Sequence, residues 1–100
     1  MKIDDIGERQ IKAPVRALMV GKEDNVALLL SNVKAGEAVR LLGGQIEIAA
    51  EDMVAGYKIA IKPLAPGQPV INYGRVIGTA IRAIRPGEWI HFHNLNSGAA

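Results

Sequence analysis

The chain has 100 residues, of which 49% are hydrophobic and only 4% are aromatic, and this is enough for one small domain with a core of aliphatic side chains. Twelve basic and ten acidic residues give a formal charge of +2, and no two basic residues are adjacent, which argues against a nucleic-acid-binding surface. The absence of cysteine excludes disulfides, a thiolate metal site and a cysteine nucleophile, and is typical of a reducing compartment.

We expect no targeting signal at the beginning of this sequence. Met1-Lys2-Ile3-Asp4-Asp5 has acidic residues where a signal peptide would be apolar, and no apolar run reaches membrane-spanning length. We therefore expect a cytoplasmic protein that does not contact a membrane. We expect residues 1–15 to be an N-terminal extension, residues 16–96 to form the domain, and residues 97–100 to be a C-terminal tail.

One turn pattern occurs three times in the middle of the chain. Residues 33–39, 64–70 and 84–90 all read apolar, any residue, Ala or Pro, Gly, Glu or Gln, any residue, apolar. Pro sets φ at the second position of a β turn and Gly accepts a positive φ at the third, which together favour a type II turn. The copies are either one repeated element or three unrelated β turns, and both interpretations predict strand connections.

Segments rich in Val and Ile flank these turns and predict strands. Residues 26–31, 57–62 and 76–83 precede turns, and further strands begin at Val39, Val70 and Ile90. Gly43-Gly44 predicts a two-residue hairpin, residues 73–75 predict a bend, and residues 49–54 are compatible with one helical turn. About eight short strands predict a mostly β, compact, clip-like fold with little helix.

The segment His91-Phe92-His93-Asn94 is the strongest candidate site. In a strand, His91 and His93 would share a face with Trp89, while Phe92 would point the other way. Imidazoles at this spacing can ligate one divalent cation, or one of them can act as a general acid or base. Two ligands do not complete a metal site, so the others would come from elsewhere or from another chain. The alternative is a solvated strand face.

Several segments in fixed order resemble the SAF domain of the altronate and galactarate dehydratase family. They are residues 24–27, 56–61, 66–74, 76–78 and 86–94, so the resemblance runs from about Arg16 to Leu95. It implies a β-clip fold, found either within a sugar-acid dehydratase or as a separate small subunit beside a large catalytic subunit. The small subunit of sulfolactate sulfo-lyase is similar.

The resemblance also implies chemistry and site residues. The expected function is that of a small subunit of a hydro-lyase that acts on a sugar acid with a divalent metal, commonly Fe²⁺, and that is inactive without its large subunit. The implied catalytic residues and metal ligands are His91 and His93, and the implied substrate contacts are Asn94, Tyr57 and Lys58. Where many relatives have Gly-His-Lys, this chain has Gly56-Tyr57-Lys58, so a phenol replaces a possible third imidazole.

Two further functions remain open. Domains resembling this one also occur in sialic acid synthases, antifreeze proteins and the chaperones of flagella and pili, so a stand-alone carbohydrate- or peptide-binding module without catalytic activity is the alternative. The exposed strand edges of a small β sheet would also permit a homo-oligomer.

Overall fold

The computed structural model describes residues 13–97, so residues 1–12 of the expected extension and 98–100 of the expected tail lie outside the described residues. Residues 13–97 form nine strands and no helix, which confirms the prediction of a mostly β, clip-like fold. No helix in this part of the chain is long and apolar enough to cross a membrane. The strands are β1 (Val15–Leu18), β2 (Val26–Leu29), β3 (Ala38–Leu41), β4 (Ile46–Ile48), β5 (Lys58–Ala60), β6 (Pro69–Asn72), β7 (Arg75–Ala80), β8 (Trp89–Ile90) and β9 (Leu95–Asn96).

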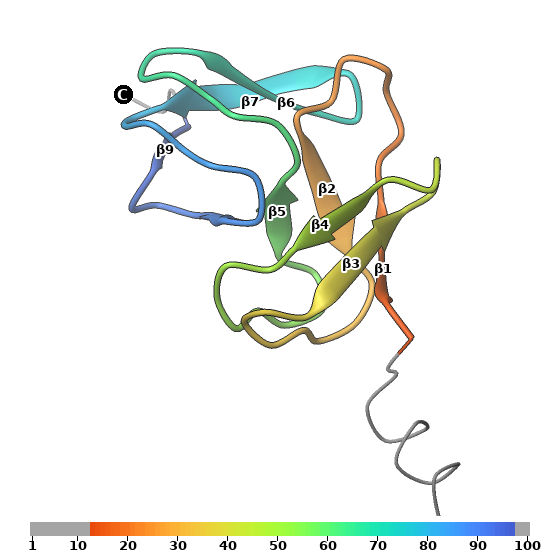
Figure 1. The fold of residues 1–100 in the computed structure, drawn as a ribbon. Helices are drawn as coiled ribbons and strands as arrows, with labels where there is room; N and C mark the ends of the chain where they lie inside the picture. Colours follow the sequence, from red (N-terminus) through yellow and green to blue (C-terminus); the bar gives the residue numbers. More distant parts are fainter. Residues whose placement is uncertain (1–12, 98–100) are drawn as a thin grey trace, which may run out of the picture.

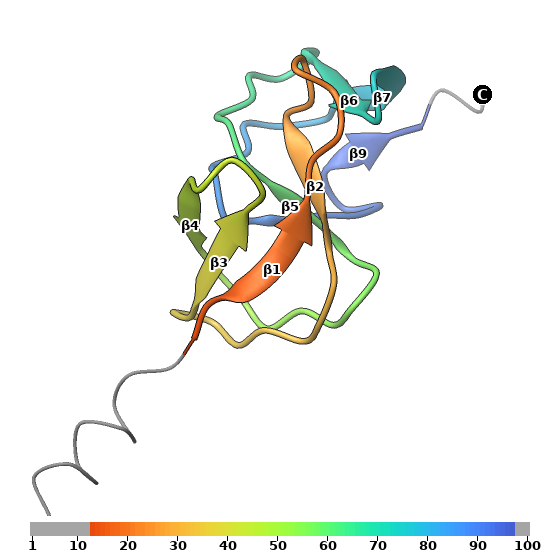
Figure 2. The ribbon, with the colours of Figure 1, turned by 90° about the vertical axis from the view of Figure 1, so that its right-hand side faces the viewer.

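The strands form two sheets that pack around two hydrophobic cores. A six-stranded sheet has the order β4-β3-β1-β2-β5-β8, and a three-stranded sheet has the order β6-β7-β9 (Figure 1). Strand β1 lies between β3 and β2, parallel to β3 and antiparallel to β2 (Figure 2). Leu29, Val39 and Ile59 are central to one core, whereas Val26, Val70 and Ile84 belong to a second core between the sheets. The fold is therefore two small packed units that share strands β2 and β5.

The predicted turn occurs four times within the described residues. The turns span residues 34–37, 54–57, 65–68 and 85–88, and in each the fourth N–H donates to the first carbonyl at 2.9–3.2 Å. Their third residues are Gly36, Gly56, Gly67 and Gly87, all with φ between 84° and 96°. The three copies found in the sequence are confirmed as turns, and the copy ending at Tyr57 was missed because Tyr replaces Glu or Gln.

The four turns are joined in two pairs. The apolar residue directly before each turn forms an antiparallel bridge with the apolar residue before another turn. Val33 pairs with Met53, and Leu64 pairs with Ile84. The expected helical turn over residues 49–54 is therefore wrong, because the backbone of Met53 exchanges both hydrogen bonds with Val33. Strands β3 and β4 form the hairpin predicted at Gly43-Gly44, but Leu41 bonds with Gln45, so the loop has three residues (42–44) instead of the predicted two. The predicted bend at residues 73–75 is the turn of the β6–β7 hairpin.

Asn25 links the two sheets. It precedes β2, and its side-chain amide donates to the carbonyl of Pro69 at 3.0 Å and accepts from the N–H of Ile71 at 2.7 Å. Its backbone N–H also donates to the Ile71 carbonyl at 3.1 Å, and its own carbonyl accepts from Ile61 at 3.0 Å. Asn25 is only 4% exposed, so each of these bonds forms in a largely water-free environment. The link therefore fixes how β6 is placed against β2 and β5.

Asp24 holds the hairpin turn of the second sheet. Its fully buried carboxylate accepts hydrogen bonds from four backbone N–H groups, at 2.8–3.2 Å. The donors are Val20, Gly21, Tyr73 and Gly74. Tyr73 and Gly74 have φ of 55° and 73°, as in the turns that favour Asn-Gly or Gly-Gly, so the carboxylate stabilises a conformation that is unfavourable for Tyr. Burial alone would raise the pKa of Asp24, but these hydrogen bonds outweigh it and lower the pKa.

We predict that Asp24→Asn lowers the free energy of unfolding by about 2–4 kcal/mol. The variant replaces one acceptor oxygen by an NH₂ group, which would face backbone N–H groups that need an acceptor. Urea unfolding at pH 7 measures the loss. Asp52→Asn is the control, since Asp52 is exposed and accepts one hydrogen bond, from Ala35, and should cost about 1 kcal/mol or less. Equal losses for the two variants would contradict the role given to Asp24.

The same carboxylate makes stability depend on pH. Because its pKa is lower in the folded protein than in the unfolded chain, where it is about 3.9, its contribution is present above that pH. The contribution is lost as the pH falls from about 4 toward the lower folded pKa. Unfolding free energies measured from pH 6 to pH 2.5 should therefore decline more steeply for the wild type than for Asp24→Asn. Parallel curves would disprove this linkage.

Candidate functional site

Five rings from two segments of the chain gather at one place on the surface. Tyr57 stacks on Trp89 with ring centroids 4.3 Å apart and planes 2° from parallel, and Trp89 stacks on His91 at 4.0 Å. His93 lies 5.9 Å from both Trp89 and His91, and Phe92 is tilted against His91 at 4.5 Å. We call these five residues the ring platform. The predicted proximity of Trp89, His91 and His93 is confirmed.

Trp89 is the middle member of the platform. It contacts Tyr57 and His91 at stacking distance, whereas no contact joins Tyr57 to His91, so the two rings cover opposite faces of the indole. Offset or parallel stacking of this kind adds about 0.5–1.5 kcal/mol per pair beyond the burial of area. The faces of Trp89 are thus occupied within the chain, and the ring acts as a support that orients His91.

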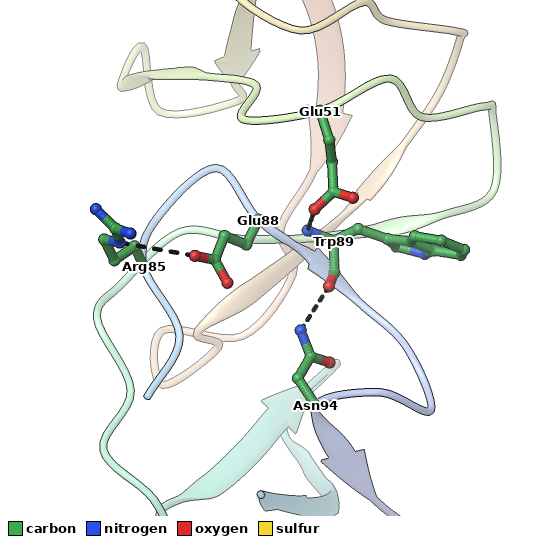
Figure 3. Close-up of polar contacts among 5 residues, drawn as sticks. All are labelled: Glu51, Arg85, Glu88, Trp89 and Asn94. Atoms are coloured by element: carbon green, nitrogen blue, oxygen red, sulfur yellow. Dashed lines mark hydrogen bonds and ion pairs between the residues drawn. The ribbon is translucent and has the colours of Figure 1, made fainter. Parts of the chain in front are cut away.

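The backbone of Trp89 is held on both sides. Its N–H donates to the Glu51 carboxylate at 3.1 Å, and its carbonyl accepts from the side-chain amide of Asn94 at 2.8 Å (Figure 3). The preceding turn is also fixed, because the Gly87 carbonyl accepts from Ala50 at 2.9 Å. This role of Glu51 was not predicted from the sequence.

The predicted strand over residues 91–94 is wrong, because strand β8 ends at Ile90 and the chain turns. The carbonyl of His91 accepts from the N–H groups of Asn94 and Leu95, at 3.0 and 2.8 Å. The side-chain oxygen of Asn94 accepts from the N–H of His91 at 2.8 Å. This turn sends the chain back to pair as β9 with β7, and it leaves Phe92 83% exposed instead of on an apolar inner face.

Three of the five predicted site residues lie together. Tyr57, His91 and His93 belong to the platform, whereas Asn94 is fully buried and both ends of its amide are bonded to the backbone of its own loop. Lys58 is the first residue of β5, directly after Tyr57, and takes no part in the ring contacts of the platform. Successive strand residues point to opposite faces, so Lys58 projects away from the side of Tyr57.

The platform supplies only part of a metal site. His91 and His93 can present two imidazole nitrogens, but residues 13–97 contain no group of three His, Asp or Glu side chains placed to hold a metal. Glu51, the carboxylate nearest in the hydrogen-bond network, is engaged by the Trp89 N–H. A divalent cation at the histidines would therefore need ligands from outside the described residues.

A family model for the altronate/galactarate dehydratase SAF domain matches residues 15–98. The chain belongs to this SAF domain family. The SAF chain is 36% identical over 77 residues to the altronate dehydratase of Bacillus subtilis (strain 168) and 37% identical over 71 residues to that of Escherichia coli (strain K12). It is also 43% identical over 42 residues to the alpha subunit of (2R)-sulfolactate sulfo-lyase from Chromohalobacter salexigens.

The two altronate dehydratases are much longer than the SAF chain. The matches cover 77% and 71% of the SAF chain but only 15% and 14% of the two altronate dehydratases. The sulfo-lyase match covers 42% of the SAF chain and 45% of that subunit. The shared part is thus one domain of the dehydratases, and most of their length has no counterpart in this sequence.

We predict that Asn94→Ala lowers the free energy of unfolding by about 2–4 kcal/mol, because it removes two buried hydrogen bonds and leaves the Trp89 carbonyl unpaired. His93→Ala is the control, since His93 is exposed and should change stability by about 0.5 kcal/mol or less. Urea unfolding followed by the fluorescence of the single Trp measures both. Equal losses of unfolding free energy in His93→Ala and Asn94→Ala would disprove the role given to the Asn94 hydrogen bonds.

We predict that Gly87→Ala is much more damaging than Gly36→Ala, although both glycines have positive φ, of 96° and 87°. A Cβ at Gly87 would collide with the carbonyl oxygen of Ile48, whereas one at Gly36 meets nothing within 4 Å. Gly36→Ala should cost about 1 kcal/mol from backbone strain alone. Thermal unfolding compares the two variants. Similar unfolding midpoints would show that the nearby carbonyl of Ile48 does not restrict residue 87 to glycine.

Proposed function

We propose that this SAF chain is the small subunit of a two-component hydro-lyase that acts on a sugar acid, with a large catalytic subunit completing the site. The observation that carries the proposal is the ring platform, which presents His91 and His93 at the surface of a domain that spans about one-seventh of its dehydratase relatives. A relative named as a subunit of a sulfo-lyase supports the separation of this domain from a catalytic chain.

The histidines suit the chemistry of hydroxy-acid dehydration. Loss of a proton next to a carboxylate creates negative charge, and the departing hydroxyl needs a proton donor. An imidazole can transfer protons near neutral pH, and His91 is oriented for this by its contact with Trp89. We assign His91 and His93 to the shared site, as ligands of its metal or, where no metal is bound to them, as its acid–base groups, with Asn94 holding their loop in place.

A divalent metal, commonly Fe²⁺ in the family, would be held by His91 and His93 together with ligands from the large subunit. Such an ion would supply a positive charge that stabilises the negative charge created at the substrate. Tyr57, where many relatives have His, offers a hydroxyl that can donate or accept a hydrogen bond to substrate. Lys58 is a further substrate contact only if the large subunit brings the substrate to the opposite side of β5.

We predict that the SAF chain, mixed with a large subunit of the dehydratase family, forms a complex that dehydrates altronate or a related sugar acid. His91→Ala and His93→Ala should each lower the rate of the complex by about a hundredfold or more, which is typical of a lost acid–base group. Arg75→Gln, on exposed β7, is the control and should leave the rate unchanged. The assay follows formation of the keto acid product.

Two further measurements separate the effect of each variant on complex formation from its effect on catalysis. Analytical ultracentrifugation shows whether each variant still binds the large subunit, and calorimetry with Mn²⁺ shows whether the complex binds metal through the histidines. A complex that turns over equally well with His91→Ala and His93→Ala would disprove the assignment. No complex with any large subunit of the family would count against the small-subunit function itself.

A stand-alone carbohydrate-binding module is the second candidate, because Phe92 is 83% exposed beside His91 and aromatic faces stack on sugar rings. This function predicts binding of sugars by the isolated chain without metal. Glycan-array binding that is lost in Phe92→Ala and unchanged by a chelator would favour it over the small-subunit function.

A further inference from the structure

Two arginines stand side by side on the outer face of the six-stranded sheet. Arg16 of β1 and Arg40 of β3 are register partners in the parallel pair, and both are exposed. Their neighbours Ala17 and Val39 point inward and belong to the first core. The two guanidinium groups therefore project from the face opposite the core on which Tyr57 and Trp89 pack.

The arginines line a cavity with apolar walls. The cavity is half open to solvent, has a volume of about 340 Å³, and is lined by Arg16, Ala17, Leu30, Arg40, Leu41 and Leu42. Leu30 and Leu42 are 52% and 72% exposed, so both offer apolar surface to a ligand in this cavity. A largely apolar hollow with a few charged groups is the usual form of a small-molecule site, and this volume lies within the range of such sites.

The positive charges of the cavity have no partner within the described residues. Neither guanidinium makes an ion pair or a hydrogen bond there, whereas Arg85 pairs with Glu88. Like charges directly opposite each other on neighbouring strands are unfavourable, and an anion between them removes the repulsion. Guanidinium groups bind carboxylates through paired hydrogen bonds, so the charges select a carboxylate and the leucines select an apolar body.

We propose that the cavity between Arg16 and Arg40 binds an organic carboxylate with an apolar body. This site goes beyond the proposed dehydratase function, because a polyhydroxylated sugar acid would place hydroxyl groups against Leu30 and Leu42 without hydrogen-bond partners. A second copy of the chain is a poor occupant, since the same face would bring four arginines together. The ligand is held by its carboxylate between the guanidinium groups, with its chain against the leucines.

The test uses hexanoate as the probe and NMR of the ¹⁵N-labelled full chain as the readout. Hexanoate should shift the amide signals of Ala17, Leu41 and Leu42 in a saturable way, and less strongly when salt is added. Hexanamide has the same body without the charge, and gluconate has the charge without the apolar body. Each should bind about tenfold more weakly than hexanoate.

Variants then assign the binding to the arginines. Arg16→Gln and Arg40→Gln should each weaken hexanoate binding about tenfold, and Arg16→Lys, which keeps the charge without the planar fork, should fall between. Arg82→Gln is the control, because Arg82 is an exposed arginine that does not line the cavity. Unchanged signals far from the cavity show that the variants are folded.

The proposal is overturned if hexanoate does not bind, if hexanamide binds equally well, or if the glutamine variants bind like the wild type. None of these results depends on dehydratase activity.

Discussion

The side chains of Asp24 and Asn25 join two sheets that otherwise have separate hydrogen-bond ladders. Asn25 ties β2 to β6, and Asp24 holds the hairpin turn between β6 and β7. This junction also governs the candidate site, because the loop of residues 91–94 leaves β8 in the first sheet and enters β9 in the second. The position of both histidines therefore depends on how the two sheets are spaced. A buried carboxylate and amide far from the platform in sequence are thus positioning groups for it.

The ring platform includes one residue of the repeated Gly-containing turn, Tyr57. In two turns the fourth residue, Glu37 or Gln68, accepts a hydrogen bond from the N–H of the first, and in a third Glu88 pairs with Arg85. Tyr57 occupies the equivalent position and cannot cap its turn in this way, and it stacks on Trp89 instead. The turn that departs from the repeat is therefore the one that contributes to the candidate site, as expected where function competes with local stability.

Features set by neighbouring residues could be predicted from the sequence, and features set by distant contacts could not. The strands and the Gly-containing turns follow from local φ preferences and alternation. The turn at residues 91–94 was predicted as strand because its apolar and polar residues alternate, yet the Asn94 amide bonds with Trp89 and His91 reverse the chain. The junction at Asp24-Asn25 and the pairing of Arg16 with Arg40 depend on register between distant segments, which no local pattern encodes.

Rigidity rather than completeness distinguishes the candidate site. Trp89 is fixed through its backbone by Glu51 and Asn94 and through both ring faces by Tyr57 and His91. A catalytic imidazole gains from such fixed orientation, because less conformational freedom is lost when substrate binds. The described residues offer no third metal ligand to complete the arrangement. For the proposed shared site, this orientation is an advantage, since a partner could then supply ligands without having to order this loop.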